Sequence, residues 1–175
     1  TVQKKVLTPE HDDVLRTDNG LAIALGADGE SAEAMQLYEQ ILETRKRNKN
    51  TEPRQLLLAV NNVASSYQSN GRLKEALQLF EENLAAYKEL FGEDHLQTLR
   101  AVDRLASITN TLGNADDAIA LYEQALEKRR EKLGNDHPST IESVAGLGFA
   151  YRDAARHKDA EVLLKEALER RQRLY

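Results

Sequence analysis

The chain has 175 residues, of which 41% are hydrophobic and 30% charged, with a formal net charge of −5. This balance is typical of a folded chain with its own hydrophobic core, and the mildly acidic total argues against a dedicated nucleic-acid binder. The absence of cysteine excludes disulfides, thiolate metal sites and a cysteine nucleophile. No apolar run approaches the roughly 20 residues of a membrane helix, so we expect a cytoplasmic protein without a membrane partner.

The composition favours an all-α fold. Proline occurs three times and glycine nine times, while Ala, Leu, Glu, Gln, Lys and Arg make up most of the chain. These six residue types are the strongest helix formers. Alternating runs of β-branched and aromatic residues, which would predict strands, are missing.

The first predicted elements are a short tail and a weak helix. Residues 1–7 align with the last residues of the helices that end further along the chain at Phe91 and Leu133, so they are predicted to be the end of a preceding helix. The next helix contains Gly20 and Gly26, each of which costs about 1 kcal/mol relative to alanine. We therefore expect Val14–Leu25 to be the least stable segment of the chain.

The following elements are pairs of helices. Apolar residues recur at helical spacing within Leu57–Gly71, and a second helix starts near Leu73 and stops at Gly92. The same pattern returns twice further along the chain. In the linkers, Asp94 and Asp136 are predicted to cap the helices that follow them.

A period of 42 residues runs through all of these elements. It predicts one array over residues 1–175 with repeats at about 8–49, 50–91, 92–133 and 134–175. The residues that recur at this step include Gly29, Gly71 and Gly113, and then Ala34, Ala76, Ala118 and Ala160.

These motifs resemble the tetratricopeptide repeat. The 42-residue step, the linker Leu133–Pro138 and the run Val60–Ala64 look specifically like the kinesin light chain subclass. The resemblance implies an α-α superhelix of four helix-turn-helix repeats, plus the tail of a preceding helix. It also implies a non-catalytic scaffold, in which the first helices of successive repeats line a concave groove for a protein partner.

By that resemblance, selected positions of the first helices form a peptide-binding surface. Asparagine offers a donor and an acceptor to a peptide backbone, and arginine offers a planar fork to carboxylates. We therefore expect an extended, acidic peptide segment as the ligand, as in cargo or adaptor recognition. The candidate residues are Arg16, Asn19, Asn61, Asn62, Ser65, Arg100, Arg104, Ser107 and Arg152.

The chaperone-binding tetratricopeptide class offers an alternative ligand, a C-terminal carboxylate. Asn62, Arg100 and Arg104 stand where that class places an Asn, a Lys and an Arg. The first repeat departs from the pattern, because Asn19 and Ile23 replace the Lys and Asn of that class. An internal acidic segment is therefore the preferred hypothesis.

The sequence gives little support for a metal, nucleotide, catalytic or nucleic-acid site. The linker histidines His11, His95 and His137 belong to different repeats, so we expect no metal site. We interpret His95 and His137 as helix-start residues. Gly146-Leu147-Gly148 lacks the third glycine and the preceding strand of a nucleotide-binding loop. We expect no catalytic site and no cofactor. Three basic clusters, at residues 45–49, 128–132 and 170–173, are interpreted as solvated helix ends rather than nucleic-acid contacts.

A rival hypothesis makes the array a structural, oligomerising or sensor segment of a larger signalling protein, fused to an ATPase or kinase. Leu163, Leu164 and Leu168 in the last helix are predicted to have no further helix covering them. Solenoids normally need a polar cap at such an end. The rival hypothesis therefore predicts either flanking repeats or end-to-end self-association through the terminal repeats.

Overall fold

A computed structural model describes residues 8–174, which contain eight α-helices and no strand. The predicted tail at residues 1–7 and the last residue, Tyr175, lie outside the described residues. The all-α prediction is confirmed. The helices are α1 (Asp12–Ala27), α2 (Ser31–Arg47), α3 (Pro53–Ser69), α4 (Leu73–Phe91), α5 (Leu96–Thr111), α6 (Ala115–Leu133), α7 (Pro138–Asp153) and α8 (His157–Leu174).

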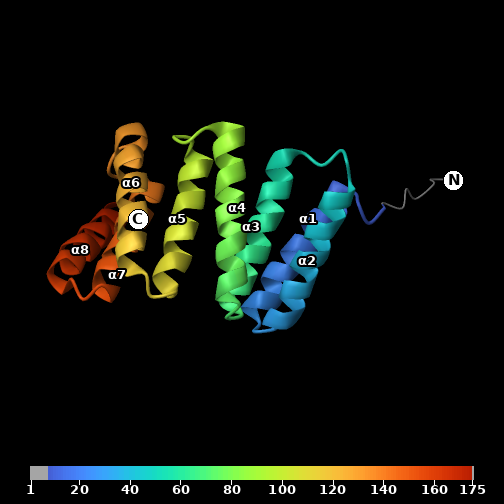
Figure 1. Cartoon of the computed structure of the whole chain (residues 1–175), viewed down its shortest axis with the longest axis horizontal. Helices are drawn as coiled ribbons and strands as arrows, with labels where there is room; N and C mark the ends of the chain where they lie inside the picture. Colours follow the sequence, from blue (N-terminus) through green and yellow to red (C-terminus); the bar gives the residue numbers. More distant parts are fainter. Residues whose placement is uncertain (1–7, 175) are drawn as a thin grey trace. The chain divides into compact units, whose positions relative to one another are not determined.

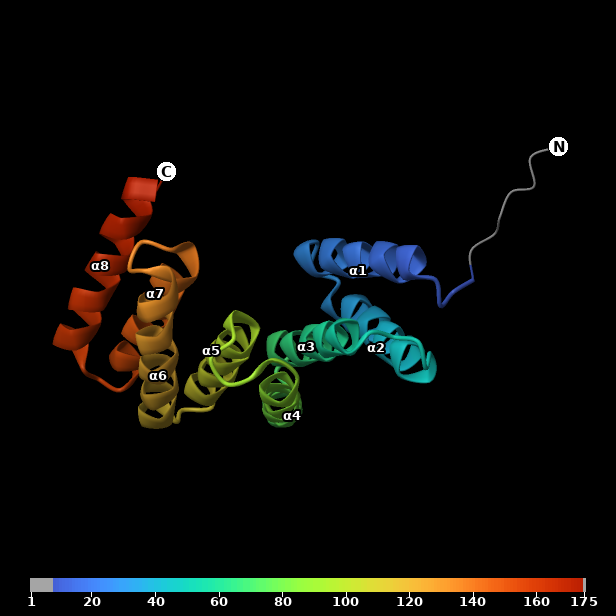
Figure 2. The same ribbon diagram turned by 90° about the horizontal axis from the view of Figure 1, so that it is seen from above.

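The chain divides into two compact units, residues 1–79 and 80–175. In the first unit, α1 packs against α2 and α2 against α3 (Figure 1). In the second unit, α5, α6, α7 and α8 pack in chain order, and α5 also contacts α7 (Figure 2). Because α5 and α7 are neighbours, their side chains can form one surface within this unit.

A left-handed residue separates the two helices of each hairpin. Gly29, Gly71 and Gly113 have φ values of 87°, 77° and 89°, and Ala155 takes the same position with a φ of 60°. A positive φ costs a residue with a side chain more than it costs glycine. The 42-residue glycine pattern therefore marks the turns between paired helices, with one non-glycine exception.

Each unit has its own hydrophobic cluster. Unit 1 buries Leu15, Ile41, Leu42, Ala59 and Val63. The cluster of unit 2 is larger and joins α5, α6, α7 and α8. Its buried members are Ala106, Ala118, Ile119, Tyr122, Leu126, Ile141, Val144, Leu147, Ala150, Tyr151, Ala160 and Ala167.

The linker histidines cap the first helices. The Nδ1 atoms of His11, His95 and His137 each accept a hydrogen bond from the backbone N–H two residues later, at 3.1, 3.2 and 3.1 Å. The interpretation of His95 and His137 as helix-start residues is confirmed, and His11 takes the same position. The prediction that Asp94 and Asp136 form these caps is wrong, because the N-cap position falls one residue later.

The two aspartates instead pair with the basic ends of second helices. Asp94 forms an ion pair with Lys128, and Asp136 contacts Arg170 Nη1 at 2.6 Å. The pKa of Asp94 is lowered, chiefly by its hydrogen bond with Lys128. These basic ends are therefore not simply solvated, as the sequence suggested, since some of their side chains hold the neighbouring linkers.

The last helix is only partly uncovered. Leu163 packs against the cluster of unit 2, whereas Leu168 is 57% exposed and Val162 is 66% exposed. The expectation of an uncovered apolar face thus holds for Leu168 and fails for Leu163.

Candidate functional site

In unit 1, α1 and α3 present a polar surface joined by an asparagine pair. Asn62 Nδ2 donates a hydrogen bond to Asn19 Oδ1 at 2.6 Å. Asn62 and Ser65 also line a pocket of about 300 Å³ between these helices, with Tyr38 of α2 beside them. The structure therefore brings three of the predicted residues together on this unit.

Two other predicted residues of unit 1 are placed less favourably. Asn61 is only 8% exposed, because its position on α3 faces the helix packing rather than solvent. This corrects the expectation that Asn61 offers its amide to a ligand. Arg16 is exposed on α1 but already forms an ion pair with Asp13, one turn earlier on the same helix.

In unit 2, the predicted residues Arg100, Arg104 and Ser107 line one pocket between α5 and α7. We call it the α5–α7 pocket, and its volume is about 340 Å³. Its remaining lining residues come from α5, α6, α7 and α8: Asp103, Tyr122, Glu142, Ala145, Gly146, Phe149 and Arg171.

A missing side chain opens the α5–α7 pocket down to Tyr122. Gly146 occupies the same repeat position as Arg104 and Asn62. A Cβ atom at Gly146 would lie 2.7 Å from Tyr122 Cε1, closer than such contacts allow. The ring is buried, and this burial is the main cause that raises the pKa of Tyr122 to about 12. The phenol therefore stays neutral at the floor of the pocket.

The pocket wall holds two neighbouring guanidinium groups. Burial lowers the pKa of Arg104, and the like charge of Arg100 lowers it further. Arg100 itself is exposed, and its side chain makes no hydrogen bond or ion pair with any of residues 8–174. The Arg100 cation is thus available to an anionic ligand.

A buried ion pair supports the pocket from below. Arg129 of α6 is 1% exposed, forms an ion pair with Asp103 and donates to Ser143 Oγ. The effect of burial on Asp103 is larger than the opposing effect of the Arg129 charge, so the pKa of Asp103 is raised to about 6. The sequence interpretation of residues 128–132 as a solvated end is therefore wrong for Arg129. Its repeat counterpart Tyr87, an aromatic residue, was the signal that this position is buried.

Arg152 lies outside the α5–α7 pocket. Its Nε atom is 2.8 Å from Asp153 Oδ1, and its guanidinium lies 5.2 Å from the centre of the Phe149 ring. Phe149 lines the pocket and is 46% exposed. Arg152 therefore flanks the pocket through Phe149 and is partly neutralised by Asp153.

Residues 8–174 contain no group of three or more histidine, aspartate or glutamate side chains that could hold a metal ion. None of the helices described is both long and apolar enough to cross a membrane.

Family models of the tetratricopeptide repeat match most of the chain. One matches residues 55–127 and again 100–173, and a second matches residues 14–48. No curated protein matches the sequence.

Solved structures with the same fold include kinesin light chain-like proteins. A Podosopora anserina putative kinesin light chain with nearly identical TPR-like repeats is 28% identical, with a TM-score of 0.75, over 99% of this chain and 82% of that one. BtubC (BKLC) from P. vanneervenii is 23% identical, with a TM-score of 0.78, over 93% and 64% of the two chains. Bacillus thuringiensis PlcR, solved with the peptide PapR7 and DNA, is 16% identical, with a TM-score of 0.77, over 99% and 60%.

Proposed function

Because the chain belongs to the tetratricopeptide repeat family and is of the kinesin light chain-like kind, we propose that it binds an extended, acidic peptide segment of a protein partner. The repeat fold is generally a non-catalytic scaffold for protein interactions, and no enzyme family is indicated. In this proposal the α5–α7 pocket is the centre of the binding surface. Short-segment recognition of this type has affinities on the order of micromolar.

The observation that supports an acidic ligand is the arginine pair. The like charge of Arg100 disfavours the charged state of Arg104, and Arg100 forms no ion pair with any of residues 8–174. A carboxylate of the ligand would relieve this repulsion and accept hydrogen bonds from the guanidinium fork. Glu142 and Asp103 also line the pocket, but Asp103 is engaged by Arg129.

The other lining residues suggest how the rest of the segment would lie. Phe149 offers an exposed apolar surface beside the hollow above Gly146, which suits an apolar side chain next to the acidic one. Ser107 can donate to or accept from the peptide backbone.

The test is a binding screen with fluorescent 12-residue peptides of matched length, one set rich in Asp and Glu and the other with Asn and Gln in their place. We expect the acidic set to bind the wild-type protein. Arg100→Glu should weaken this binding at least about tenfold, since a cation is replaced by a repelling charge. Arg100→Glu combined with Arg104→Glu should abolish it.

Arg47→Glu provides the matched control. Arg47 is also exposed and unpaired among the described residues, but it lies at the end of α2, outside the α5–α7 pocket. The Arg47→Glu substitution changes the net charge by the same amount as Arg100→Glu. It should leave the affinity for the acidic peptides nearly unchanged. Full binding by the double arginine variant, or no enrichment of acidic peptides, would overturn the proposal.

The rival hypothesis of self-association draws on the exposed residues of α8. Val162 and Leu168 are six residues apart on this helix, so at 3.6 residues per turn they point roughly 120° away from each other. They do not form one apolar stripe for a second copy to cover. The arginine pair therefore supports peptide binding better than α8 supports stacking.

A further inference from the structure

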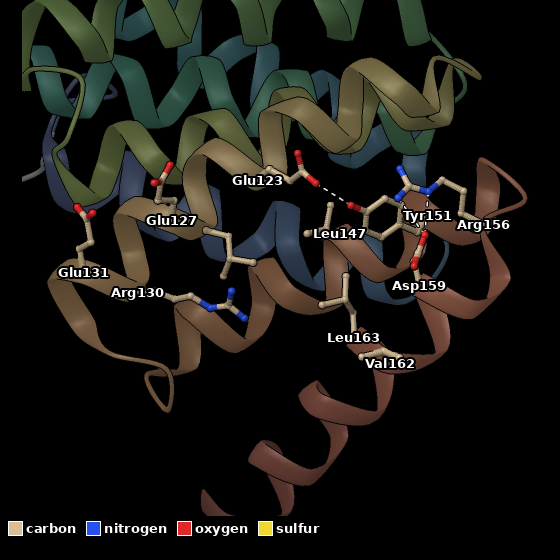
Figure 3. Close-up of a pocket in the computed structure, with 11 residues that line it drawn as sticks. Glu123, Glu127, Arg130, Glu131, Leu147, Tyr151, Arg156, Asp159, Val162 and Leu163 are labelled. Atoms are coloured by element: carbon tan, nitrogen blue, oxygen red, sulfur yellow. Dashed lines mark hydrogen bonds and ion pairs between the residues drawn. The ribbon is translucent and has the colours of Figure 1, made fainter.

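Each unit contains a second pocket, formed between its second helices and lined by none of the predicted peptide-binding residues. The α6–α8 pocket has a volume of about 600 Å³ (Figure 3). The α2–α4 pocket, between α2 and the first two turns of α4, has a volume of about 390 Å³. Every residue that lines the α2–α4 pocket has a counterpart in the lining of the α6–α8 pocket at the same repeat position, two repeats later. The pairs are Glu39 and Glu123, Leu42 and Leu126, Glu43 and Glu127, Lys46 and Arg130, Val63 and Leu147, Tyr67 and Tyr151, Glu75 and Asp159, Gln78 and Val162, and Leu79 and Leu163.

The same polar network closes one side of both pockets. In the α6–α8 pocket, Tyr151 Oη donates to Glu123 Oε1 at 2.6 Å, and the Arg156 guanidinium lies 4.1 Å from the centre of the tyrosine ring. Arg156 Nη2 is in turn 2.9 Å from Asp159 Oδ2. Figure 3 shows these side chains at one end of the pocket, opposite Glu127 and Glu131.

The α2–α4 pocket repeats this network with the same geometry. Tyr67 Oη donates to Glu39 Oε1 at 2.6 Å, and the Arg72 guanidinium lies 3.7 Å from the centre of the Tyr67 ring. Arg72 Nη2 is 2.8 Å from Glu75 Oε1. Each wall is thus held in place by hydrogen bonds and a cation–π contact before any ligand arrives.

The network is not a general consequence of the repeat. In the repeat between these two, Thr109 stands at the tyrosine position and Asn114 at the arginine position. The tyrosine–glutamate–arginine arrangement therefore alternates along the chain, because the sequence supplies it only in every second repeat.

The α6–α8 pocket combines an apolar floor with an acidic rim. Leu126, Leu147 and Leu163 form the floor. Each of the two arginines in the lining is already paired, Arg130 with Glu166 at 3.1 Å and Arg156 with Asp159.

Two carboxylates of the rim form no ion pair with the described residues. Glu123 accepts from Tyr151, whereas the side chains of Glu127 and Glu131 make no hydrogen bond or ion pair with residues 8–174. Together with Glu123 and Asp159, they give the lining four carboxylates against two guanidinium groups. The pocket is therefore acidic where it opens and apolar beneath.

The geometry points to a docking site for a basic segment of a protein partner, in which lysine or arginine side chains lay their methylene stems on the leucine floor and place their charges at Glu127 and Glu131. Long cationic side chains cover apolar surface with their stems while their charged ends reach polar groups. An acidic peptide would be repelled here. This site is therefore complementary in charge to the α5–α7 pocket and independent of it.

The site can be tested by NMR titration of the ¹⁵N-labelled chain with a 12-residue peptide of alternating Lys and Leu at 0.15 M salt. A peptide with diaminobutyrate in place of each lysine has a stem two methylenes shorter and carries the same charge at pH 6.5. We expect the lysine peptide to shift the amide signals of Glu127, Glu131 and Val162, and to bind more tightly than the short-stem peptide. Equal affinity for the two would overturn the proposal, because it would indicate attraction of charge alone.

A pair of variants with a matched control completes the test. Glu127→Gln with Glu131→Gln should weaken binding of the lysine peptide about fivefold, since two exposed ion pairs are lost. Glu81→Gln with Glu89→Gln removes two exposed, unpaired carboxylates of α4 and should have little effect. The proposal is wrong if both pairs of substitutions weaken binding equally, or if the peptide shifts signals of the α5–α7 pocket instead.

Discussion

Gly20 and Gly146 occupy the same position in the first helix of their repeats, yet the space around them is opposite. A Cβ atom at Gly20 would have no heavy atom within 4 Å, whereas one at Gly146 would lie 2.7 Å from the ring of Tyr122. Glycine inside a helix carries an entropic cost relative to alanine. At Gly20 a side chain could be added without a clash, so nothing in the structure requires glycine there. At Gly146 the absence of a side chain leaves room for Tyr122 and opens the α5–α7 pocket.

Replacement of the two glycines should therefore have opposite effects on stability. Gly20→Ala should raise the free energy of unfolding by about 1 kcal/mol, because it removes the helix penalty without a steric cost. Gly146→Ala should lower it by about 1–3 kcal/mol, because the methyl group displaces a buried ring. Chemical denaturation followed by circular dichroism measures both, and two changes of the same sign would contradict this explanation.

The repeat made most of the fold predictable from sequence. Ala34, Ala76, Ala118 and Ala160 recur at the 42-residue step, and all four are buried. Only a small residue fits where paired helices approach closely, so alanine recurs in the sequence at the repeat distance. The turn glycines leave a similar trace through their positive φ values.

The sites were less predictable, because they depend on contacts between repeats. Arg129 stands in a run of charged residues that resembles a solvated helix end. It can be buried because it forms an ion pair with Asp103 and a hydrogen bond with Ser143, which lie on two other helices. The depth of the α5–α7 pocket likewise requires Gly146 and Tyr122 together. Such pairings are not periodic. The repeat counterpart Tyr87 indicates that the position of Arg129 is buried, but no pattern identifies Asp103 and Ser143 as its partners.

The Asp103 carboxyl should make stability depend on pH. Its folded pKa of about 6 lies above the ordinary value of 3.8, because burial disfavours the charged form more than Arg129 favours it. The folded state therefore holds the proton more tightly, so this contribution is fully present below pH 3.8 and is lost as the pH rises through about 6. From about pH 5 to about pH 7.5 we expect the free energy of unfolding to fall by about 1 kcal/mol through this group.

Asp103→Asn isolates that contribution, since asparagine does not titrate. Denaturation curves at pH 5, 6 and 7.5 should show the decline in the wild type and a flatter profile in the variant. In ¹³C NMR, the Asp103 carboxyl should titrate with a midpoint near pH 6. A midpoint at or below the ordinary value would show that the ion pair with Arg129 outweighs burial.

Segment Val14–Leu25 of α1 should be the first to open in hydrogen exchange. The helix buries only Leu15 and Ala22 and contains two glycines, whereas α7 buries eight residues. Few buried contacts imply a low free energy of local opening. Exchange followed by mass spectrometry should show this segment losing protection before α7, and Gly20→Ala should slow it. Uniform protection across the two helices would contradict the prediction.

The histidine caps should contribute measurably to stability. His137 is the best position for a test, because the cap at His95 is combined with ring stacking on Phe91 at 4.7 Å. His137→Ala leaves the Ser139 N–H without its acceptor and should cost about 1 kcal/mol, whereas His137→Asn should restore most of the loss. His157→Ala is the control, because this exposed histidine begins α8 and its side chain makes no hydrogen bond with residues 8–174. Equal losses at His137 and His157 in thermal denaturation would show that the caps contribute nothing specific.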